Sequence, residues 1–156
     1  MDPADDLPQR ASAPAARVHF QLFADAAPGH IRWRLLSGNR REIGRSVASY
    51  ADADECRVHI NLMLAQLPLM TTRVVRASSS SWSWEMLLGT QLTVISGRRF
   101  DRQIRCAQAL ALFRELAPEA VIHPAVMPAL ARRGGGERVA LLPARAGAVR
   151  LGRALR

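Results

Sequence analysis

The stretch Ile31-Arg32-Trp33-Arg34-Leu35-Leu36-Ser37-Gly38-Asn39 gives the clearest indication of how this chain folds. Its apolar side chains alternate with arginines, and a period of two is typical of a β-strand with one buried face. Gly38 and Asn39 predict a turn, because both residue types tolerate positive φ. The segment Val18–Leu22 alternates in the same way upstream, and a third strand is expected over residues 42–47.

A helix is expected after the third strand. Asp52 has the character of an N-cap, and Glu55 follows three residues later in capping-box spacing. The apolar residues behind this cap recur at helical spacing up to Pro68, and they are Cys56, Ile60, Met63, Leu64 and Leu67. Residues 17–68 therefore predict a strand-strand-strand-helix unit.

The same pattern returns about 50 residues later, as an internal repeat would. At a shift of 51 residues and then of 50, the matched pairs are Trp33 and Trp84, Gly38 and Gly89, Ile43 and Val94, Tyr50 and Phe100, Cys56 and Cys106, Met63 and Phe113, and Pro68 and Pro118. This alignment loses one residue between the third strand and the helix. It predicts three further strands over residues 71–77, 81–88 and 91–96, and a helix near 102–116. A short final strand is expected at 120–123, limited by Pro124.

The expected organisation is one domain over residues 17–127, with copy one at 17–68 and copy two at 69–127. Neither copy has enough elements to bury a sufficient core alone. We therefore expect a monomer that is an internal pseudo-dimer, or a weak homodimer. Residues 1–16 are rich in Ala, Pro and Asp and predict a flexible leader, and residues 128–156 predict a disordered basic tail rich in Arg, Ala and Gly.

The charge is strongly basic and unevenly distributed. All 22 basic residues are arginine, the formal net charge is +9, and the tail holds seven arginines against Glu137 alone. This balance permits binding to nucleic acid or to an acidic protein, although abundant arginine and alanine are also typical of high-GC coding bias. The candidate contacts are Arg32 and Arg34 on the exposed face of the sheet, and Arg132, Arg133 and Arg138 in the tail.

The chain has no feature that predicts a membrane or secreted protein. No apolar run approaches the ~20 residues that a spanning helix needs. Residues 1–6 are acidic, unlike a secretory signal, and two cysteines do not make a disulfide framework. We expect a cytoplasmic protein of bacterial type.

No group of side chains predicts catalysis, a cofactor or a metal. Cys56 and Cys106 could be reactive low-pKa thiols or a bridged pair, but their place on the apolar stripe favours small core residues. His59 lies one turn after Cys56, and two ligands are too few for a zinc site. The phase of Trp33, Trp82 and Trp84 favours the core over a platform for stacking bases.

The first copy resembles the YegP-like family at residues 32–39, Ile43, Ser46 and Tyr50, with Tyr50 one place late. Arg40 stands where that family usually has glycine. In the second copy Thr90 replaces the asparagine, and Ser96 or Gly97 stands for the serine. The resemblance covers roughly residues 17–123 and implies an α+β fold. In it, two tandem β-β-β-α copies build one antiparallel sheet with both helices on one face. The family's motif implies no catalytic residue.

The sequence leaves the function unknown. Its leading expectation is a non-enzymatic small binding or protein-interaction module, whose basic tail engages an acidic partner. The alternative is weak, sequence-independent binding of nucleic acid through the arginine-rich tail and the sheet face. Binding of that kind must fall steeply with salt.

Overall fold

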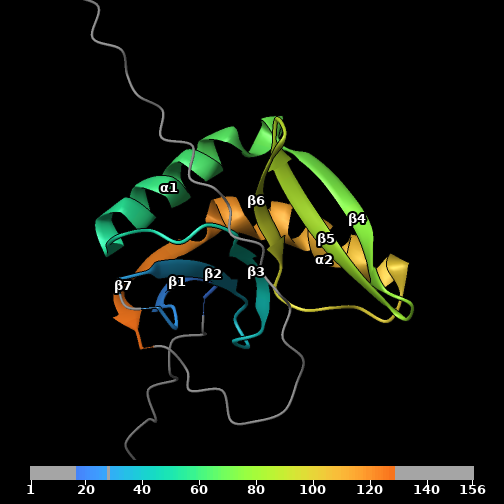
Figure 1. Ribbon diagram of the computed structural model, residues 1–156, viewed down its shortest axis with the longest axis horizontal. Coiled ribbons are helices and arrows are strands. Elements are labelled where there is room, and N and C mark those ends of the chain that lie inside the picture. Colours follow the sequence, from blue (N-terminus) through green and yellow to red (C-terminus); the bar gives the residue numbers. More distant parts are fainter. Residues whose placement is uncertain (1–16, 28, 129–156) are drawn as a thin grey trace, which may run out of the picture.

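The computed structural model describes residues 17–27 and 29–128, and these form an α+β fold of one sheet and two helices (Figure 1). The predicted leader and most of the predicted basic tail lie outside the described residues. The strands are β1 His19–Ala24, β2 Ile31–Leu36, β3 Glu42–Ser46, β4 Thr71–Ser78, β5 Ser81–Leu88, β6 Gln91–Ser96 and β7 Val121–Met127. The helices are α1 Ala53–Gln66 and α2 Gln103–Leu116, each followed by a 3-10 turn, Leu67–Leu69 and Ala117–Glu119. Neither helix is long and apolar enough to cross a membrane.

The seven strands lie in the order β4-β5-β6-β3-β2-β1-β7. Five of the six neighbouring pairs are antiparallel, and β7 pairs with β1 in parallel. The six strands of the two predicted copies thus form the expected antiparallel sheet. The final strand β7, for which the sequence predicted no direction, adds to the edge at β1 in parallel. β7 is also longer than expected and continues past Pro124. Proline is tolerated there because β7 is an edge strand, and the β1–β7 register shifts between Phe20 and Leu22.

The core lies between one face of the sheet and the two helices. Phe20, Leu22, Trp33, Leu35, Trp84, Met86 and Val94 face Cys56, Ile60, Met63, Cys106, Leu110 and Phe113. α1 contacts β2, and α2 contacts β3, β4 and β5. Trp33 and Trp84 are 1% and 0% exposed, which confirms the prediction that they belong to the core. The other face of the sheet carries Arg32 and Arg34.

Two backbone contacts recur in residues 17–68 (the first half) and 69–127 (the second half). The backbone N–H of Trp33 donates to the Ser46 hydroxyl over 3.2 Å, and that of Trp84 donates to Ser96 over 3.4 Å. Ser96 rather than Gly97 is therefore the equivalent serine. Tyr50 and Phe100 each form an isolated antiparallel bridge, with Ile31 and Trp82 respectively.

The pairing register shows where one half is a residue shorter than the other. Leu35 pairs with Gly44, and Met86 pairs with Val94, so Gly44 rather than Ile43 is equivalent to Val94. The extra residue lies in the turn between β2 and β3, not between the third strand and the helix as predicted. Arg40 takes the left-handed conformation in this turn, at φ 61°, and neither Gly38 nor Asn39 does. Arg40 thus adopts the backbone geometry that favours glycine.

The two helices begin differently. The Asp52 carboxylate accepts a hydrogen bond from the Glu55 backbone N–H over 2.8 Å, which confirms the predicted N-cap. The Glu55 carboxylate accepts from the Ala51 backbone N–H, one residue before the position expected in a capping box. At the start of α2 the N-cap is Arg102, whose side chain makes no capping hydrogen bond.

Candidate ligand pocket

A cavity of about 760 Å³ lies where the two halves meet. Its walls are the β2–β3 turn with the start of β3, the loop after β6, and the inner side of α2. The Gly97 N–H donates to the Ile43 carbonyl over 3.1 Å and holds the loop beside β3. A Cβ at Gly97 would lie 2.9 Å from the Glu42 carbonyl oxygen, so glycine permits this close approach.

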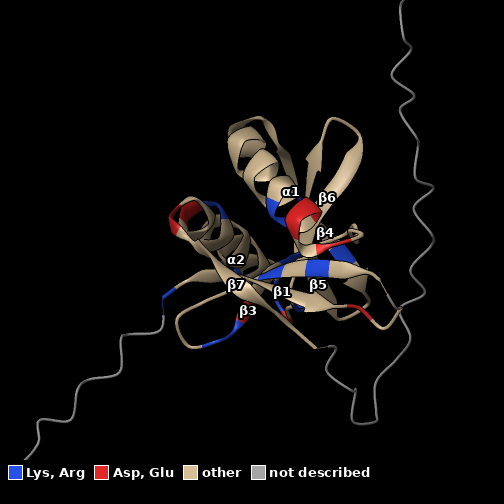
Figure 2. Ribbon diagram, turned by 90° about the vertical axis from the view of Figure 1, so that its left-hand side faces the viewer, with Lys and Arg blue, Asp and Glu red and all other residues tan. Residues whose placement is uncertain are grey.

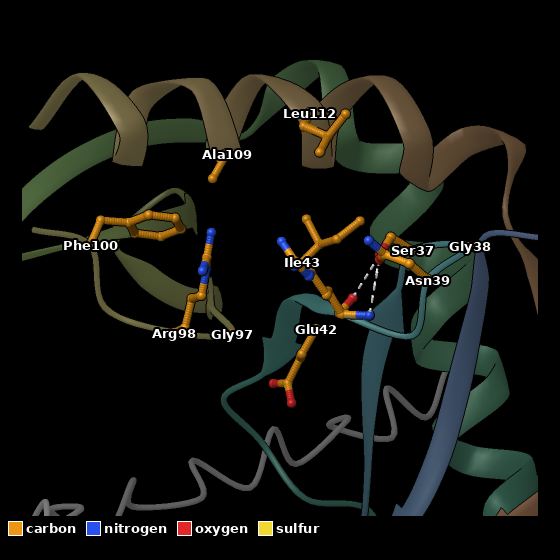
Figure 3. A pocket seen from close by; sticks show the side chains of 11 residues that line it. Ser37, Gly38, Asn39, Glu42, Ile43, Gly97, Arg98, Phe100, Ala109 and Leu112 are labelled. Atoms are coloured by element: carbon orange, nitrogen blue, oxygen red, sulfur yellow. Dashed lines mark hydrogen bonds between the residues drawn. The ribbon is translucent and has the colours of Figure 1, made fainter. Parts of the chain in front are cut away.

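The inner surface of the cavity is mainly apolar. Ala109 and Leu112 project from α2 towards it, Phe100 lies at one side, and Ile43 lies opposite (Figure 3). The turn is closed by hydrogen bonds of its own, because the Ser37 hydroxyl donates to Asn39 Oδ1 over 2.5 Å. The cavity therefore has an apolar body with a polar rim, as small-molecule sites commonly do.

The charged side chains that line the cavity differ in whether they form ion pairs. Arg98 rises beside the Phe100 ring, with its Cζ 4.8 Å from the ring centroid, and Arg41 also lines the cavity. Neither arginine forms an ion pair within the described residues. The Glu42 carboxylate points away from the cavity (Figure 3) and pairs with Arg45. The site is therefore positively charged.

Comparison with known proteins gives the fold a precedent. No protein-family model and no curated protein sequence matches the chain. Among solved structures, it is similar to the solution NMR structure of yegP from E. coli, a protein of unknown function. The two share 13% sequence identity with a TM-score of 0.57, over 72% of this chain and 95% of that one. This is a YegP-like fold. At this identity the likeness extends to the fold alone, and yegP supplies no function.

In this YegP-like fold, neither Arg32 nor Arg34 lines the cavity. Arg32 Nε lies 3.0 Å from Asp25 Oδ2, on the sheet face that the helices leave open. Arg34 donates to Gln21 Oε1 through Nε and Nη2, over 2.9 and 2.6 Å, and its Cζ lies 5.3 Å from the Phe23 ring centroid. Both guanidinium groups are thus engaged by neighbouring strands. Arg132, Arg133 and Arg138 lie outside the described residues.

The arginines of the described residues do not form one basic face. Figure 2 shows basic positions on strands, on turns and on both helices, with acidic positions among them. Binding to a polyanion draws its affinity from many neighbouring cations. The sheet face therefore gives the nucleic-acid alternative less support than the sequence alone suggested.

The two cysteines are free, fully buried residues on equivalent turns of α1 and α2. Burial raises the pKa of the Cys56 thiol to about 12, and burial also raises the pKa of Cys106. A thiol with a raised pKa is a poor nucleophile at neutral pH. Both cysteines are thus placed as small core residues, as their position on the apolar stripe favoured.

Arg98, Phe100 and Ala109 were not predicted to form a site from the sequence. The signal that could have found them is the difference between the two halves. His59 of α1 is equivalent to Ala109, and its ring lies 4.6 Å from the Tyr50 ring, centroid to centroid. The His59 ring packs on Tyr50, whereas the smaller Ala109 lines the cavity together with Phe100.

Proposed function

We propose that this protein is a non-enzymatic module that binds a small organic molecule in the cavity beside α2. The observation that carries the proposal is the cavity itself. Its volume of about 760 Å³ lies in the range of roughly 300–1,000 Å³ that is usual for small-molecule sites. Its apolar body would supply most of the binding free energy, and the few polar groups would orient the ligand.

The chemistry of the lining supports binding rather than catalysis. The Ser37 hydroxyl donates to Asn39 and lies within 3.2 Å of the Arg41 carbonyl, and neither partner can act as a general base. Glu42 is turned away and paired with arginine. The side chains with raised pKa values, Tyr50, Cys56 and Cys106, do not line the cavity.

We also infer that the domain at residues 17–127 arose by tandem duplication and works as a monomer. The paired contacts of Trp33 with Ser46 and of Trp84 with Ser96 support the duplication. β3 and β6 pair at the centre of the sheet, so the halves already form the kind of interface that two separate copies would share. The two buried free thiols are compatible with a reducing compartment, and we propose the cytoplasm.

A fragment screen followed by ¹H–¹⁵N NMR of the full chain tests the proposed function. Fragments that bind should shift the backbone amides of Gly97, Phe100 and Ala109. Leu112→Trp should abolish these shifts, because the larger ring enters the cavity. Leu62→Trp is the matched control, since Leu62 is the equivalent residue of α1 and is similarly exposed, at 50% against 42%. Fragments that shift only residues remote from the cavity would refute the proposal.

A further inference from the structure

We propose that the cavity selects an organic anion with a flat apolar body, which in chemical terms is an aromatic carboxylate. This inference rests on the proposed function and names the class of ligand for the same site. It follows from three features of the described residues: the charge of the lining, the shape of the apolar surface, and the difference between the two halves of the domain.

The charge of the lining favours an anion. Arg98 and Arg41 both line the cavity, and neither forms an ion pair within the described residues. The one acidic residue of the lining, Glu42, directs its carboxylate away from the cavity and towards Arg45. A guanidinium group offers two parallel N–H donors that match the two oxygens of a carboxylate. A carboxylate at the rim would supply the partner that Arg98 lacks.

The apolar surface favours a flat ligand body. Phe100 presents a ring at one side of the cavity, and Ile43, Ala109 and Leu112 complete the apolar walls. Arg98 already packs against the Phe100 ring, with Cζ 4.8 Å from its centroid. An aromatic ring placed beside Phe100 would bury its faces against these side chains. Its carboxylate would then lie next to the guanidinium group, so one ligand can use both parts of the site.

The difference between the two halves favours a site beside α2 over an equivalent site beside α1. The residue equivalent to Arg98 in the first half is Ala48, and the residue equivalent to Ala109 is His59. The His59 ring packs on the Tyr50 ring, whereas the small side chain of Ala109 lines the cavity beside Phe100. The first half therefore lacks the cation, and it has a histidine ring where the second half has the methyl group of Ala109. We expect one ligand per chain.

The test measures dissociation constants by NMR titration of the full chain with three probes. The probes are 2-naphthoate, its neutral analogue 2-naphthamide, and acetate, which has the charge without the rings. We expect 2-naphthoate to bind with a stoichiometry of one and about tenfold more tightly than 2-naphthamide, because a charge-assisted hydrogen bond is worth that much. Acetate should shift the same amides only at far higher concentration.

Two variants test whether Arg98 is the residue that gives the cavity its preference for an anion. Arg98→Ala should weaken 2-naphthoate about tenfold and leave 2-naphthamide nearly unchanged. Arg99→Ala is the matched control, since it removes the same charge from the neighbouring exposed residue, which does not line the cavity. It should change the affinity for 2-naphthoate less than about twofold, as expected for a screened surface charge. Both positions are exposed, so neither change should prevent folding.

The outcomes separate the ligand class from the proposed function. Equal affinity for 2-naphthoate and 2-naphthamide at the cavity overturns the preference for an anion and leaves small-molecule binding standing. Equal losses in Arg98→Ala and Arg99→Ala overturn the role of Arg98, since general surface charge would then account for the preference. Failure of both naphthalene probes, while other fragments bind the cavity, overturns the aromatic carboxylate alone.

Discussion

The substitutions Tyr50→Phe and Phe100→Tyr should change stability in opposite directions, because the two positions are equivalent and differ by one hydroxyl. The Trp33 indole N–H lies within hydrogen-bonding reach of the Tyr50 hydroxyl. In the second half the corresponding residue is Phe100, and the buried Trp84 Nε1 has no hydrogen-bond partner within the described residues. The domain thus contains, at equivalent positions, one indole N–H with a hydroxyl in reach and one without a partner.

The expected magnitudes follow from burial. Trp33 is 1% exposed, so removing its partner in Tyr50→Phe leaves a buried donor unsatisfied and should lower the free energy of unfolding by about 1–3 kcal/mol. Phe100→Tyr gives the fully buried Trp84 a partner, and one net hydrogen bond should raise the free energy of unfolding by about 1 kcal/mol. For a domain of this size, that is a rise in melting temperature of about 4 °C.

Urea denaturation of each variant, followed by tryptophan fluorescence and circular dichroism, gives the free energies of unfolding. The double variant should lie near the sum of the two single changes. If Tyr50→Phe leaves stability unchanged, or if Phe100→Tyr destabilises the domain as much as Tyr50→Phe does, the equivalence of these two positions is refuted.

Three further predictions concern the core, the helix ends and pH. Gly44→Ala should lower the free energy of unfolding by about 1–3 kcal/mol, because the new Cβ would lie 2.7 Å from the Trp84 ring and 2.9 Å from the Phe113 ring. Phe113→Met should relieve the second contact alone and so restore part of the loss in urea denaturation. Asp52→Ala should cost about 1 kcal/mol through loss of the N-cap, whereas Arg102→Asp should add a cap to α2 and raise the melting temperature. Burial raises the pKa of Cys56 from 9.0 to about 12, so the folded state holds this proton more tightly than the unfolded state. The free energy of unfolding should therefore fall as pH rises from 9 towards 12, with a smaller slope in Cys56→Ala.

Each of these three predictions would be contradicted by a specific result. A Gly44→Ala variant as stable as the parent would mean that β3 does not approach α2 this closely. Equal effects of Asp52→Ala and Arg102→Asp in the same direction would contradict the difference between the helix ends. A pH slope that Cys56→Ala leaves unchanged would show that this thiol does not control alkaline stability.

The elements of the fold were predictable because they depend on local patterns. Alternation around Trp33 and Trp84 identified strands, and the spacing of Cys56, Ile60 and Met63 identified a helix with its buried face. The N-cap at Asp52 followed from residue type and position. The period of the apolar residues and the type of the capping residue determine strands, helices and helix ends over a few positions. A single sequence is therefore enough to predict these features.

The features that sequence reasoning missed depend on contacts between distant segments. The parallel pairing of β7 with β1 joins residues about 100 apart, and no local pattern carries its direction. The extra residue of the β2–β3 turn was misplaced because Ile43 and Gly44 are both buried, and only the register with Leu35 separates them. Arg40 adopts positive φ through the closure of the turn, although its residue type disfavours that geometry.

The cavity was the hardest feature to predict, because it depends on the small side chain of Ala109 and not on a recognisable motif. An alanine does not by itself indicate a binding site. Ala109 becomes informative only when it is compared with His59, its equivalent in α1, whose ring packs on Tyr50. Arg98 likewise stood among many arginines. Arg32 and Arg34 attracted more attention in the sequence, but they serve the sheet by binding Asp25 and Gln21.

The affinity of Ala109→His for 2-naphthoate tests the central claim most directly, since this change copies the covered surface of the first half into the second. The introduced imidazole should pack on Phe100 as His59 packs on Tyr50, and binding should weaken at least about tenfold while the fold is retained. Ala107→His is the matched control, because Ala107 is an exposed residue of α2 that does not line the cavity, and its affinity should stay that of the parent. Unchanged affinity in Ala109→His, with the same amides shifting, would contradict the claim that the open surface beside Phe100 is the binding site.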